Sequence, residues 1–441
     1  MAIYPMTNRV QNYAWGSRTA IPYLLGDEPE DEVPVAELWM GAHPKSPSLV
    51  QADSREVSLL DLIREQPERL LGPSVYSRYG AELPFLFKVL AAERALSIQS
   101  HPSKEEAEAG FARENAAGIP VDAPERNYRD PNHKPELICA VTEFWGMRGF
   151  RPVGEIASDL LAIDSPTSRS LAGLLDAVSE RSALRALLSS LLALSPAERT
   201  ELVADATRFA EREWARLRAE GYPEPAVAVT ARPEVTAGEP DLSRGATSES
   251  ARAPERYFWL LEIARDYRGD IGVLGPLYLN TVRLKAGEAM YLPAGVLHAY
   301  LRGTGIELMA NSDNVLRGGC TAKHIDVAEL LKTTNFVHES PSILQAEGGP
   351  PRWYRSGARE FRLSVCDLDA ERADASVPME IKSRGPLILL QLSGESTLQE
   401  PGGTAFRLAR GRSAFVSAES GRVRASGSGH VYIASVMEAD A

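Results

Sequence analysis

This chain of 441 residues has few cysteines and no long hydrophobic run. Its three cysteines, Cys139, Cys320 and Cys366, are far apart and odd in number, which argues against a disulfide framework and a zinc-thiolate site. We expect them to be reduced and buried. No apolar run reaches the length of about 18 residues that a membrane span needs, so no membrane partner is expected. The first nine residues lack the basic and then apolar layout of a secretory signal, which favours a cytoplasmic protein.

An excess of positive charge is also absent. The formal net charge is −12, and affinity for nucleic acid depends mainly on Lys and Arg contacts, so nucleic acid is not an expected partner. If the substrate is anionic, the cations that bind it must be gathered locally. A chain of this length exceeds what one core usually organises, so two or three domains are expected.

The first 150 residues contain short apolar or alternating segments separated by Gly and Pro. Residues 36–40 and 83–90 are examples, and the pattern predicts strands of a β-sandwich or barrel. Only residues 59–64 and 103–115 look helical in this part. Ser103 and Glu106 have the spacing of a capping box at the start of the second helix.

From residue 152 onward the composition shifts to Ala, Leu, Glu and Arg, and the apolar residues have helical spacing. The predicted helices of this insertion are 154–162, 168–178, 181–194, 196–220 and 254–266. Ser195 and Glu198 predict a further cap. Residues 221–252 are rich in Pro, Gly, Ser and Thr, which predicts a flexible loop.

The rest of the chain is predicted to return to strands. The expected elements are strands at 278–284 and 289–292, a helix at 327–333, and strands at 361–367, 387–392 and 431–436. The domain hypothesis is a discontinuous catalytic domain of 1–151 plus 267–325, an all-α domain of 152–266, and a C-terminal jelly roll of 326–441. We find no set of ligand residues in the last domain, so a structural or interface role is expected for it.

Two possible metal donors lie in the segment Leu96-Ser-Ile-Gln-Ser-His-Pro102. At strand spacing, Gln99 and His101 point to the same side. A single His on an apolar strand is more often a packed core residue than a ligand. A second segment contains Gly287, Pro293, Gly295 and His298, where the Gly and Pro residues favour a tight bend that aims the next strand inward. This spacing resembles the second signature of the cupin superfamily.

The chain departs from the cupin signatures at two places. Arg302 stands where the second signature ordinarily ends in Asn, and Gln99-x-His101 replaces the His-x-His of the first. Together with other motifs, these departures resemble the type I phosphomannose isomerases. The motifs are Tyr13-Ala-Trp15-Gly16, Glu37-Leu-Trp-Met-Gly-Ala-His43-Pro, His133-Lys-Pro-Glu136 and Asn311-Ser-Asp313-Asn-Val-Leu-Arg317-Gly-Gly. The resemblance covers nearly the whole chain outside about 160–255. It implies a mainly β fold with a helical insertion, in which the catalytic domain is a cupin-type double-stranded β-helix.

The expected metal ligands are two imidazoles and two oxygen donors: Gln99, His101, Glu136 and His298. Such a set suits one Zn²⁺ per chain with an open position, although other divalent ions remain possible. The competing hypothesis is that Gln99 bonds a loop and Glu136 pairs with Lys134 or Arg129.

The resemblance also implies residues that act on the substrate. The expected catalytic residues are Arg317, Glu307, Asp313 and Lys134, and the expected substrate-binding residues are Trp15, Lys88, Ser97, His133, Tyr300 and Lys323. Several alternatives stay open: an edge-strand position for Lys88, a surface position for Glu307, and core roles for Trp15 and Tyr300. His43 is a weaker candidate for a supporting role. Neither the carboxylate that moves the proton nor the lysine that binds phosphate is determined.

The implied activity is the interconversion of mannose 6-phosphate and fructose 6-phosphate through an enediol or enediolate, by a monomer. Two alternatives are a cupin dioxygenase that uses iron and a cupin that binds sugar or metal without catalysis. Gln99 argues against the first alternative, and the complete set of site residues argues against the second.

Overall fold

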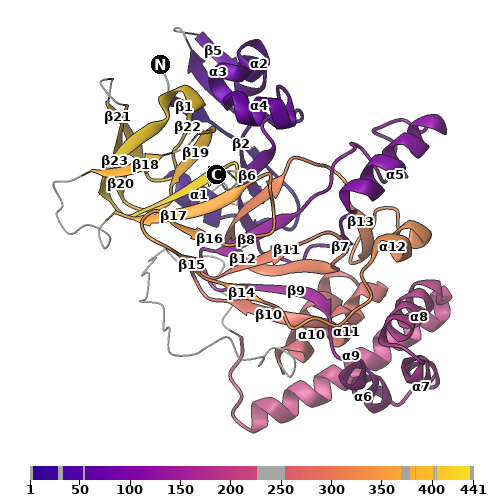
Figure 1. Ribbon diagram of the computed structural model, residues 1–441. Coiled ribbons are helices and arrows are strands. Elements are labelled where there is room, and N and C mark those ends of the chain that lie inside the picture. Colours follow the sequence, from indigo (N-terminus) through magenta and orange to yellow (C-terminus); the bar gives the residue numbers. More distant parts are fainter. Residues whose placement is uncertain are drawn as a thin grey trace.

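The computed structural model describes residues 3–27, 33–52, 55–225, 254–368, 378–382, 384–400, 403 and 405–437. Figure 1 shows a central group of strands, with the helices α6 to α9 at one end and the C-terminal strands at the other. Most of the predicted flexible loop at 221–252 lies outside the described residues. None of the described helices is long and apolar enough to cross a membrane.

The central strands form an 11-stranded sheet built around the long strand β12 (His298–Ala310). The first residues of β12 pair with β7 (Ile98–Ser100) and β9 (Phe144–Phe150), whereas its later residues pair with β6 (Phe85–Ala92) and β8 (Glu136–Ala140). All these pairings are antiparallel. The remaining strands of this sheet are β2 (Arg9–Gln11), β3 (Glu37–Met40), β10 (Leu279–Leu284), β11 (Ala289–Leu292), β13 (Leu316–Gly319) and β14 (Ile343–Leu344).

A second sheet of nine strands joins both ends of the chain. Its central members are β19 (Leu387–Gln391), β22 (Ser413–Val416) and β24 (His430–Ser435), with β15 (Ala346–Glu347), β16 (Arg352–Tyr354) and β17 (Arg362–Asp367) on one side. The N-terminal strands β1 (Ile3–Thr7), β4 (Leu49–Ala52) and β5 (Arg55–Ser58) complete the other side. A smaller sheet contains β18 (Met379–Lys382), β20 (Glu395–Gln399), β21 (Ala405–Ala409) and β23 (Arg422–Ser428). The predicted domain boundaries stay a prediction, and the sheet shared by both ends could not be read from local patterns.

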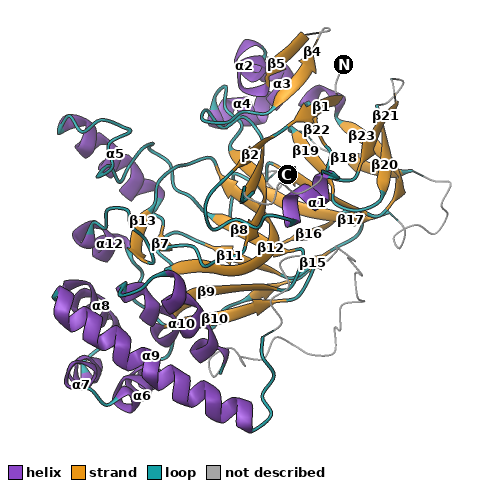
Figure 2. Cartoon of the chain, turned by 180° about the vertical axis from the view of Figure 1, so that it is seen from behind, coloured by secondary structure: helices purple, strands orange, loops and turns teal. Residues whose placement is uncertain are grey.

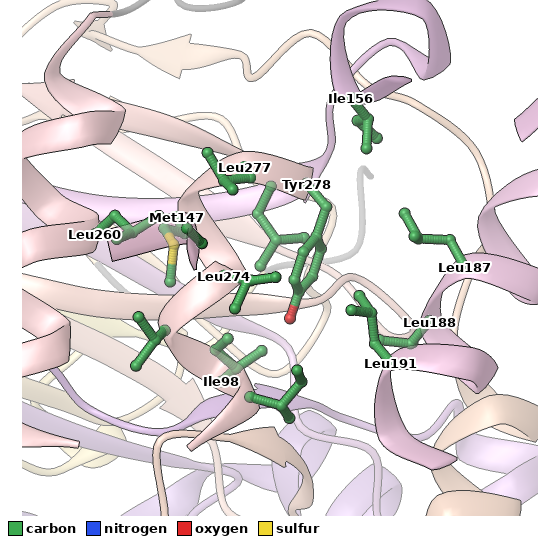
Figure 3. Packing of buried hydrophobic residues seen from close by; sticks show 14 of the residues in the cluster. Ile98, Met147, Ile156, Leu187, Leu188, Leu191, Leu260, Leu274, Leu277 and Tyr278 are labelled. Carbon is green, nitrogen blue, oxygen red and sulfur yellow. The ribbon is translucent and has the colours of Figure 1, made fainter. Parts of the chain in front are cut away.

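The helical insertion packs on the strand that carries Gln99. Its helices are α6 (Val153–Ile163), α7 (Pro166–Gly173), α8 (Glu180–Ala193), α9 (Pro196–Ala219) and α10 (Glu255–Asp266). Figure 3 shows Ile98 in the same hydrophobic cluster as Leu188 and Leu191 of α8. Because side chains alternate along a strand, burying Ile98 against the helices turns Gln99 away from them.

Several local predictions are confirmed. The strand β11 and the helix α12 (Val327–Thr333) have the predicted bounds. The helix α5 (Lys104–Ala116) begins with the expected capping box of Ser103 and Glu106, and α2 (Leu59–Glu65) is present. All three cysteines are free and buried.

The expectation of only two helices in the first 150 residues was wrong. Three short helices also form there: α1 (Ala20–Leu25), α3 (Pro67–Leu71) and α4 (Pro73–Tyr79). Each has five to seven residues, which is too short for a helical period to show in the sequence. They lie in the views of Figures 1 and 2 near the strands of the nine-stranded sheet.

Candidate active site

Three buried side chains meet at one point: His101, directly after the end of β7, Glu136 of β8 and His298 of β12. His101, Glu136 and His298 have ligand atoms that all lie within 4.8 Å of one another. The Nε2 of His101 is 3.2 Å from Glu136 Oε1, and the Nε2 of His298 is 3.4 Å from Glu136 Oε2. The structure therefore brings together three of the four predicted metal donors.

The hydrogen bonds of the two rings determine which nitrogen faces this point. His101 donates from Nδ1 to the Asn314 carbonyl (2.8 Å), and His298 donates from Nδ1 to the Val296 carbonyl (2.9 Å). In the neutral rings the lone pair is then on Nε2. Both Nε2 atoms are buried and have no hydrogen-bond partner among the described residues. Two lone pairs directed at a carboxylate fit a divalent cation such as zinc, because a carbonyl partner on the other nitrogen is the usual support of a metal-binding His.

The protonation states suit the same conclusion. Burial lowers the pKa of His101 to about 4, although Glu136 opposes that shift. Burial alone would raise the pKa of Glu136, but Lys134 and His101 outweigh it and hold this pKa well below its ordinary value. At neutral pH the site therefore holds a neutral imidazole of His101 and an ionised carboxylate, the forms that a metal ion binds.

Strand register places Gln99 beside the same point. His298 lies opposite Gln99 in the pair of β12 and β7, and Arg317 lies opposite Gln99 in the pair of β13 and β7. The side chain of Gln99 is half-buried. Its role as the fourth metal ligand stays a prediction that this register supports.

Two further groups surround Glu136. The Nζ of Lys134 is 2.9 Å from Glu136 Oε1, and the hydroxyl of Tyr300 donates to Glu136 Oε2 over 3.5 Å. Burial and the neighbouring carboxylates of Glu307 and Glu136 raise the pKa of Tyr300, so its hydroxyl keeps its proton. Tyr300 thus belongs both to a core cluster and to the site.

Lys88 and Glu307 form a buried ion pair. Lys88 Nζ is 2.8 Å from Glu307 Oε2, and the two residues lie opposite each other on β6 and β12. The edge-strand alternative for Lys88 was wrong, because β6 lies between β3 and β12. The surface alternative for Glu307 was also wrong, since this side chain is buried. Burial raises the pKa of Glu307, while Lys88 opposes the rise.

Asp313 lies in a second charged group, on the loop after β12. Its carboxylate is 2.8 Å from Lys45 Nζ and 3.7 Å from His43 Nε2. Burial alone would raise the pKa of Asp313, but Lys45 and His43 outweigh it and lower this pKa. The backbone N–H of Asp313 donates to Asp130, which holds the loop in place.

Three cations gather next to this loop without acidic partners. Arg129, Arg317 and Lys323 form no ion pair within the part of the chain that the structure describes. Burial and the charge of Arg129 lower the pKa of Arg317, and burial together with Arg317 and Arg129 lowers that of Lys323. Cations that destabilise one another in this way form a favourable place for an anion.

Comparisons with known proteins show the family of this chain. A family model described as the catalytic domain of type I phosphomannose isomerase matches residues 3–153. The chain is 39% identical over 429 residues to the mannose-6-phosphate isomerase of Escherichia coli, which covers 97% of each chain. The chain belongs to the type I phosphomannose isomerase family. The rat mannose-6-phosphate isomerase is 35% identical over 356 residues, or 77% of this chain and 74% of the rat protein.

Solved structures of this family have the same architecture. A mutant of the Salmonella typhimurium phosphomannose isomerase superposes with a TM-score of 0.82 at 36% identity, covering 99% of this chain and all of the other. A zinc-bound mannose 6-phosphate isomerase superposes with a TM-score of 0.81 at 36% identity and the same coverage. The mainly β fold with helices and antiparallel sheets is therefore that of phosphomannose isomerase.

Three predicted substrate-binding residues form no hydrogen bond, ion pair or ring contact with the metal donors among the described residues. The Nε2 of His133 donates to Glu360 Oε1 over 2.8 Å, and His133 lines a separate cavity of about 630 Å³. Ser97 is half-buried, and its side chain has no hydrogen bond within the described ranges. Trp15 is half-buried and stacks on Tyr13, with 5.7 Å between the ring centroids. The substrate roles of these three residues stay predictions.

The sequence analysis missed two buried residues next to Lys88. Glu37 Oε1 is 3.6 Å from Lys88 Nζ, and the Lys88 ammonium lies 5.3 Å from the Trp39 ring centroid. A signal was present, because Glu37 and Trp39 alternate in a strand and so point to one side. Nothing local indicated that this side faces the site.

Proposed function

We propose that this chain interconverts mannose 6-phosphate and fructose 6-phosphate by a metal-dependent proton transfer between two adjacent sugar carbons. The observation that carries the proposal is the pair of buried, unpartnered Nε2 atoms of His101 and His298 facing Glu136, in a chain of this isomerase family. The zinc-bound relatives support Zn²⁺ as the metal, for which we propose one ion per chain, and other divalent ions are compatible with the donor set.

His101, Glu136 and His298 would hold the metal ion, with Gln99 as the fourth ligand. When bound there, the ion supplies Lewis-acid stabilisation of the negative charge that develops on the sugar oxygens. Lys134 and Tyr300 orient the Glu136 carboxylate from two sides, which keeps its two oxygens directed at the two rings.

The two candidate carboxylates have pKa values shifted in opposite directions. Burial raises the pKa of Glu307, whereas Lys45 and His43 lower that of Asp313. Such a separation is typical of a site that needs one group to hold a proton and another to accept one. Asp313 is therefore the better acceptor and Glu307 the better donor for the proton movements of ring opening and isomerisation.

The phosphate would bind at the cations that have no carboxylate partner. Lys134 lies 2.9 Å from Glu136, and Lys88 lies 3.6 Å from Glu37 as well as 2.8 Å from Glu307, so each lysine keeps an acidic partner even when Glu307 holds a proton. Arg317 and Lys323 are not balanced in this way by any described acid, and a phosphate dianion would relieve their mutual repulsion. Arg317 would also stabilise the enediolate. Trp15, Tyr300 and Lys88 would form the wall that the sugar contacts, with Ser97 and His133 as outer members.

The remaining features follow from the same family. We propose a cupin-type jelly roll for the catalytic domain (1–151 plus 267–325), an all-α domain (152–266) and a second jelly roll (326–441). The long antiparallel strand β12, which pairs with four other strands, supports the first of these. A monomer in the cytoplasm, with a phosphosugar as its small-molecule partner, completes the proposal.

The two alternatives are less well supported. An iron dioxygenase would favour three His ligands or two His and one carboxylate, and His101, Glu136 and His298 match the second set. The argument against it is therefore Gln99 as an added fourth ligand, which its register opposite His298 supports, together with the isomerase family of the chain. A cupin without catalysis would not need the buried Lys88 and Glu307 pair, which is costly to bury without a function.

One assay tests the proposal directly. The purified chain is incubated with fructose 6-phosphate, and mannose 6-phosphate is measured with and without a chelator. We expect product only in the sample without chelator, and activity restored by added zinc. Formation of product that is insensitive to metal removal, or no product from a zinc-loaded sample, would contradict the proposal.

A further inference from the structure

Trp39 connects two charged groups of the site. It lies on β3, directly opposite Lys88 of β6, which in turn lies opposite Glu307 of β12. The three residues therefore form a row across three neighbouring strands. The Trp39 ring also meets the His43 ring edge-on, with 4.9 Å between centroids.

The indole group of Trp39 holds Glu37 in position. Its Nε1–H donates to Glu37 Oε2 over 2.7 Å, which leaves Glu37 Oε1 facing the Lys88 ammonium at 3.6 Å. The face of the same ring lies 5.3 Å from Lys88 Nζ, a distance suited to a cation–π contact. One side chain thus acts on Lys88 both directly and through Glu37.

The contact with His43 continues toward Asp313. The backbone N–H of Lys45 donates to His43 Nδ1 over 3.3 Å, so the ring proton is on Nε2, which faces Asp313 at 3.7 Å. Burial lowers the pKa of His43 to about 4, so this ring is a neutral donor at neutral pH. The edge-on contact with Trp39 limits rotation of the ring.

Hydrophobic packing accounts for little of this arrangement. Trp39 is buried, but its hydrophobic cluster contains only Leu86 and Met309 besides itself. A tryptophan whose main role is to fill a core normally belongs to a large cluster, as Trp145 does here.

We infer that Trp39 is a positioning residue of the isomerase reaction, which holds Lys88 through Glu37 and orients His43 toward Asp313. This inference rests on the proposed function, because Lys88 and Asp313 act on the substrate only if the chain is an isomerase. Trp39 itself does not need to touch the sugar.

The chain offers a matched control in Trp145. Its Nε1–H also donates to a Glu two residues earlier, Glu143, over 3.0 Å, and Arg283 also lies over its ring at 5.8 Å. It is buried, but in the large cluster shared with the helical insertion. Trp39→Phe and Trp145→Phe therefore remove the same chemical groups from two different places.

The test compares these variants and a double-mutant cycle. For Trp39→Phe we expect kcat/KM to fall by about tenfold or more, because a buried carboxylate loses its donor, at unchanged zinc content. Trp145→Phe should stay within about twofold of the wild type. If Trp39 acts through Glu37, the two effects should not add. The double variant that carries both Trp39→Phe and Glu37→Gln should then have a kcat/KM close to that of the less active single variant.

The pH profile gives a readout that packing would not change. Burial and the neighbouring carboxylates of Glu136 and Glu37 raise the pKa of Glu307. The cations Lys88 and Lys134 oppose this rise. If Lys88 moves in Trp39→Phe, that pKa rises further, and the alkaline limb of kcat/KM, which deprotonation of the donor Glu307 sets, shifts to higher pH. No such shift is expected for Trp145→Phe.

Each outcome decides the inference. Equal kcat/KM in the Trp39→Phe and Trp145→Phe variants, or fully additive losses in the cycle, would overturn the positioning role while the proposed function stands. If Trp39→Phe does not fold, as judged by its melting temperature, Glu37→Gln alone tests the same link, and unchanged kcat/KM in that variant overturns it. A wild-type chain without turnover would instead refute the proposed function, and this role with it.

Discussion

His298 and Gln99 lie directly opposite each other where β12 meets β7. This places an imidazole whose Nε2 has no described partner beside an amide, at the buried end of the site. The same Gln99 lies opposite Arg317 of β13, so one three-residue strand connects the metal donors with the cations that have no acid partner among the described residues. Changes on either side of β7 should therefore separate metal binding from substrate binding.

Replacing His101 should remove the metal. His101→Ala deletes one of three close donors, so we expect zinc content to fall from about one per chain to near zero and turnover to be lost. Zinc is measured by mass spectrometry of the dialysed protein. His338→Ala is the control, because His338 is half-exposed and pairs with Glu180 at 2.7 Å. Full zinc content in His101→Ala would show that the metal is held elsewhere.

Replacing Arg317 should abolish turnover without loss of metal. Arg317→Ala removes a charge that would stabilise the enediolate, and removal of such a group typically costs about 100-fold to 1000-fold in kcat. The comparison is with Arg216→Ala, whose guanidinium lies on exposed α9 and pairs with Glu213 and Glu220. Metal loss in Arg317→Ala, or near-normal turnover, would refute the assignment.

Replacing Lys323 should weaken substrate binding more than chemistry. Lys323 is exposed and its neighbours Arg317 and Arg129 repel it, so Lys323→Ala should raise KM for mannose 6-phosphate by about tenfold with a smaller change in kcat. Raising the salt concentration should narrow the difference from the wild type. Lys332→Ala is the matched variant, because this half-exposed lysine already pairs with Glu329 at 3.1 Å. A pure kcat effect would place Lys323 in the chemistry instead.

The link between His133 and Glu360 should stabilise the fold only above acidic pH. Burial alone would raise the pKa of Glu360, but its hydrogen bond with His133 outweighs burial and lowers this pKa. A carboxyl group with a lowered pKa in the folded state adds stability above its unfolded pKa of about 4.3, and this stability disappears as the pH falls through the folded value.

Glu360→Gln should therefore lower the free energy of unfolding by about 0.5–1 kcal/mol at pH 6, since both side chains are partly exposed. The difference from the wild type should shrink as the pH falls below about 4.3, and it should vanish at a second, lower pH at which the carboxyl group is protonated in both the folded and the unfolded state. Urea unfolding at both pH values measures it. A difference that persists at low pH would mean that the effect comes from packing and not from charge.

Short-range sequence patterns, such as capping residues and helical spacing, predicted the elements that depend only on neighbouring residues. The Ser103 capping box and the bounds of α12 follow from short-range hydrogen bonding and helical spacing, and both were predictable. The short helices α3 and α4 were not, because five to seven residues carry too little periodicity. The pairing of β1 with β22 was not predictable either, since it joins segments about 400 residues apart.

The candidate site divides in the same way. The donor types at Gln99, His101, Glu136 and His298 could be proposed from spacing and resemblance, and the structure brings the last three together. The burial of Lys88 against Glu307 was open in the sequence, because an alternating strand does not show which of its faces is covered. Glu37 and Trp39 were missed for the same reason.

The sequence by itself determined the chemical types of the donors, the local elements that carry them and the family to which they belong. Only the tertiary structure decided which nitrogen of His101 and His298 faces Glu136, which lysines are already balanced by carboxylates, and which cations are left for an anion. Periodicity and capping are properties of neighbouring residues. Ring orientation, burial and charge balance instead depend on strand registers between segments that are far apart in the chain.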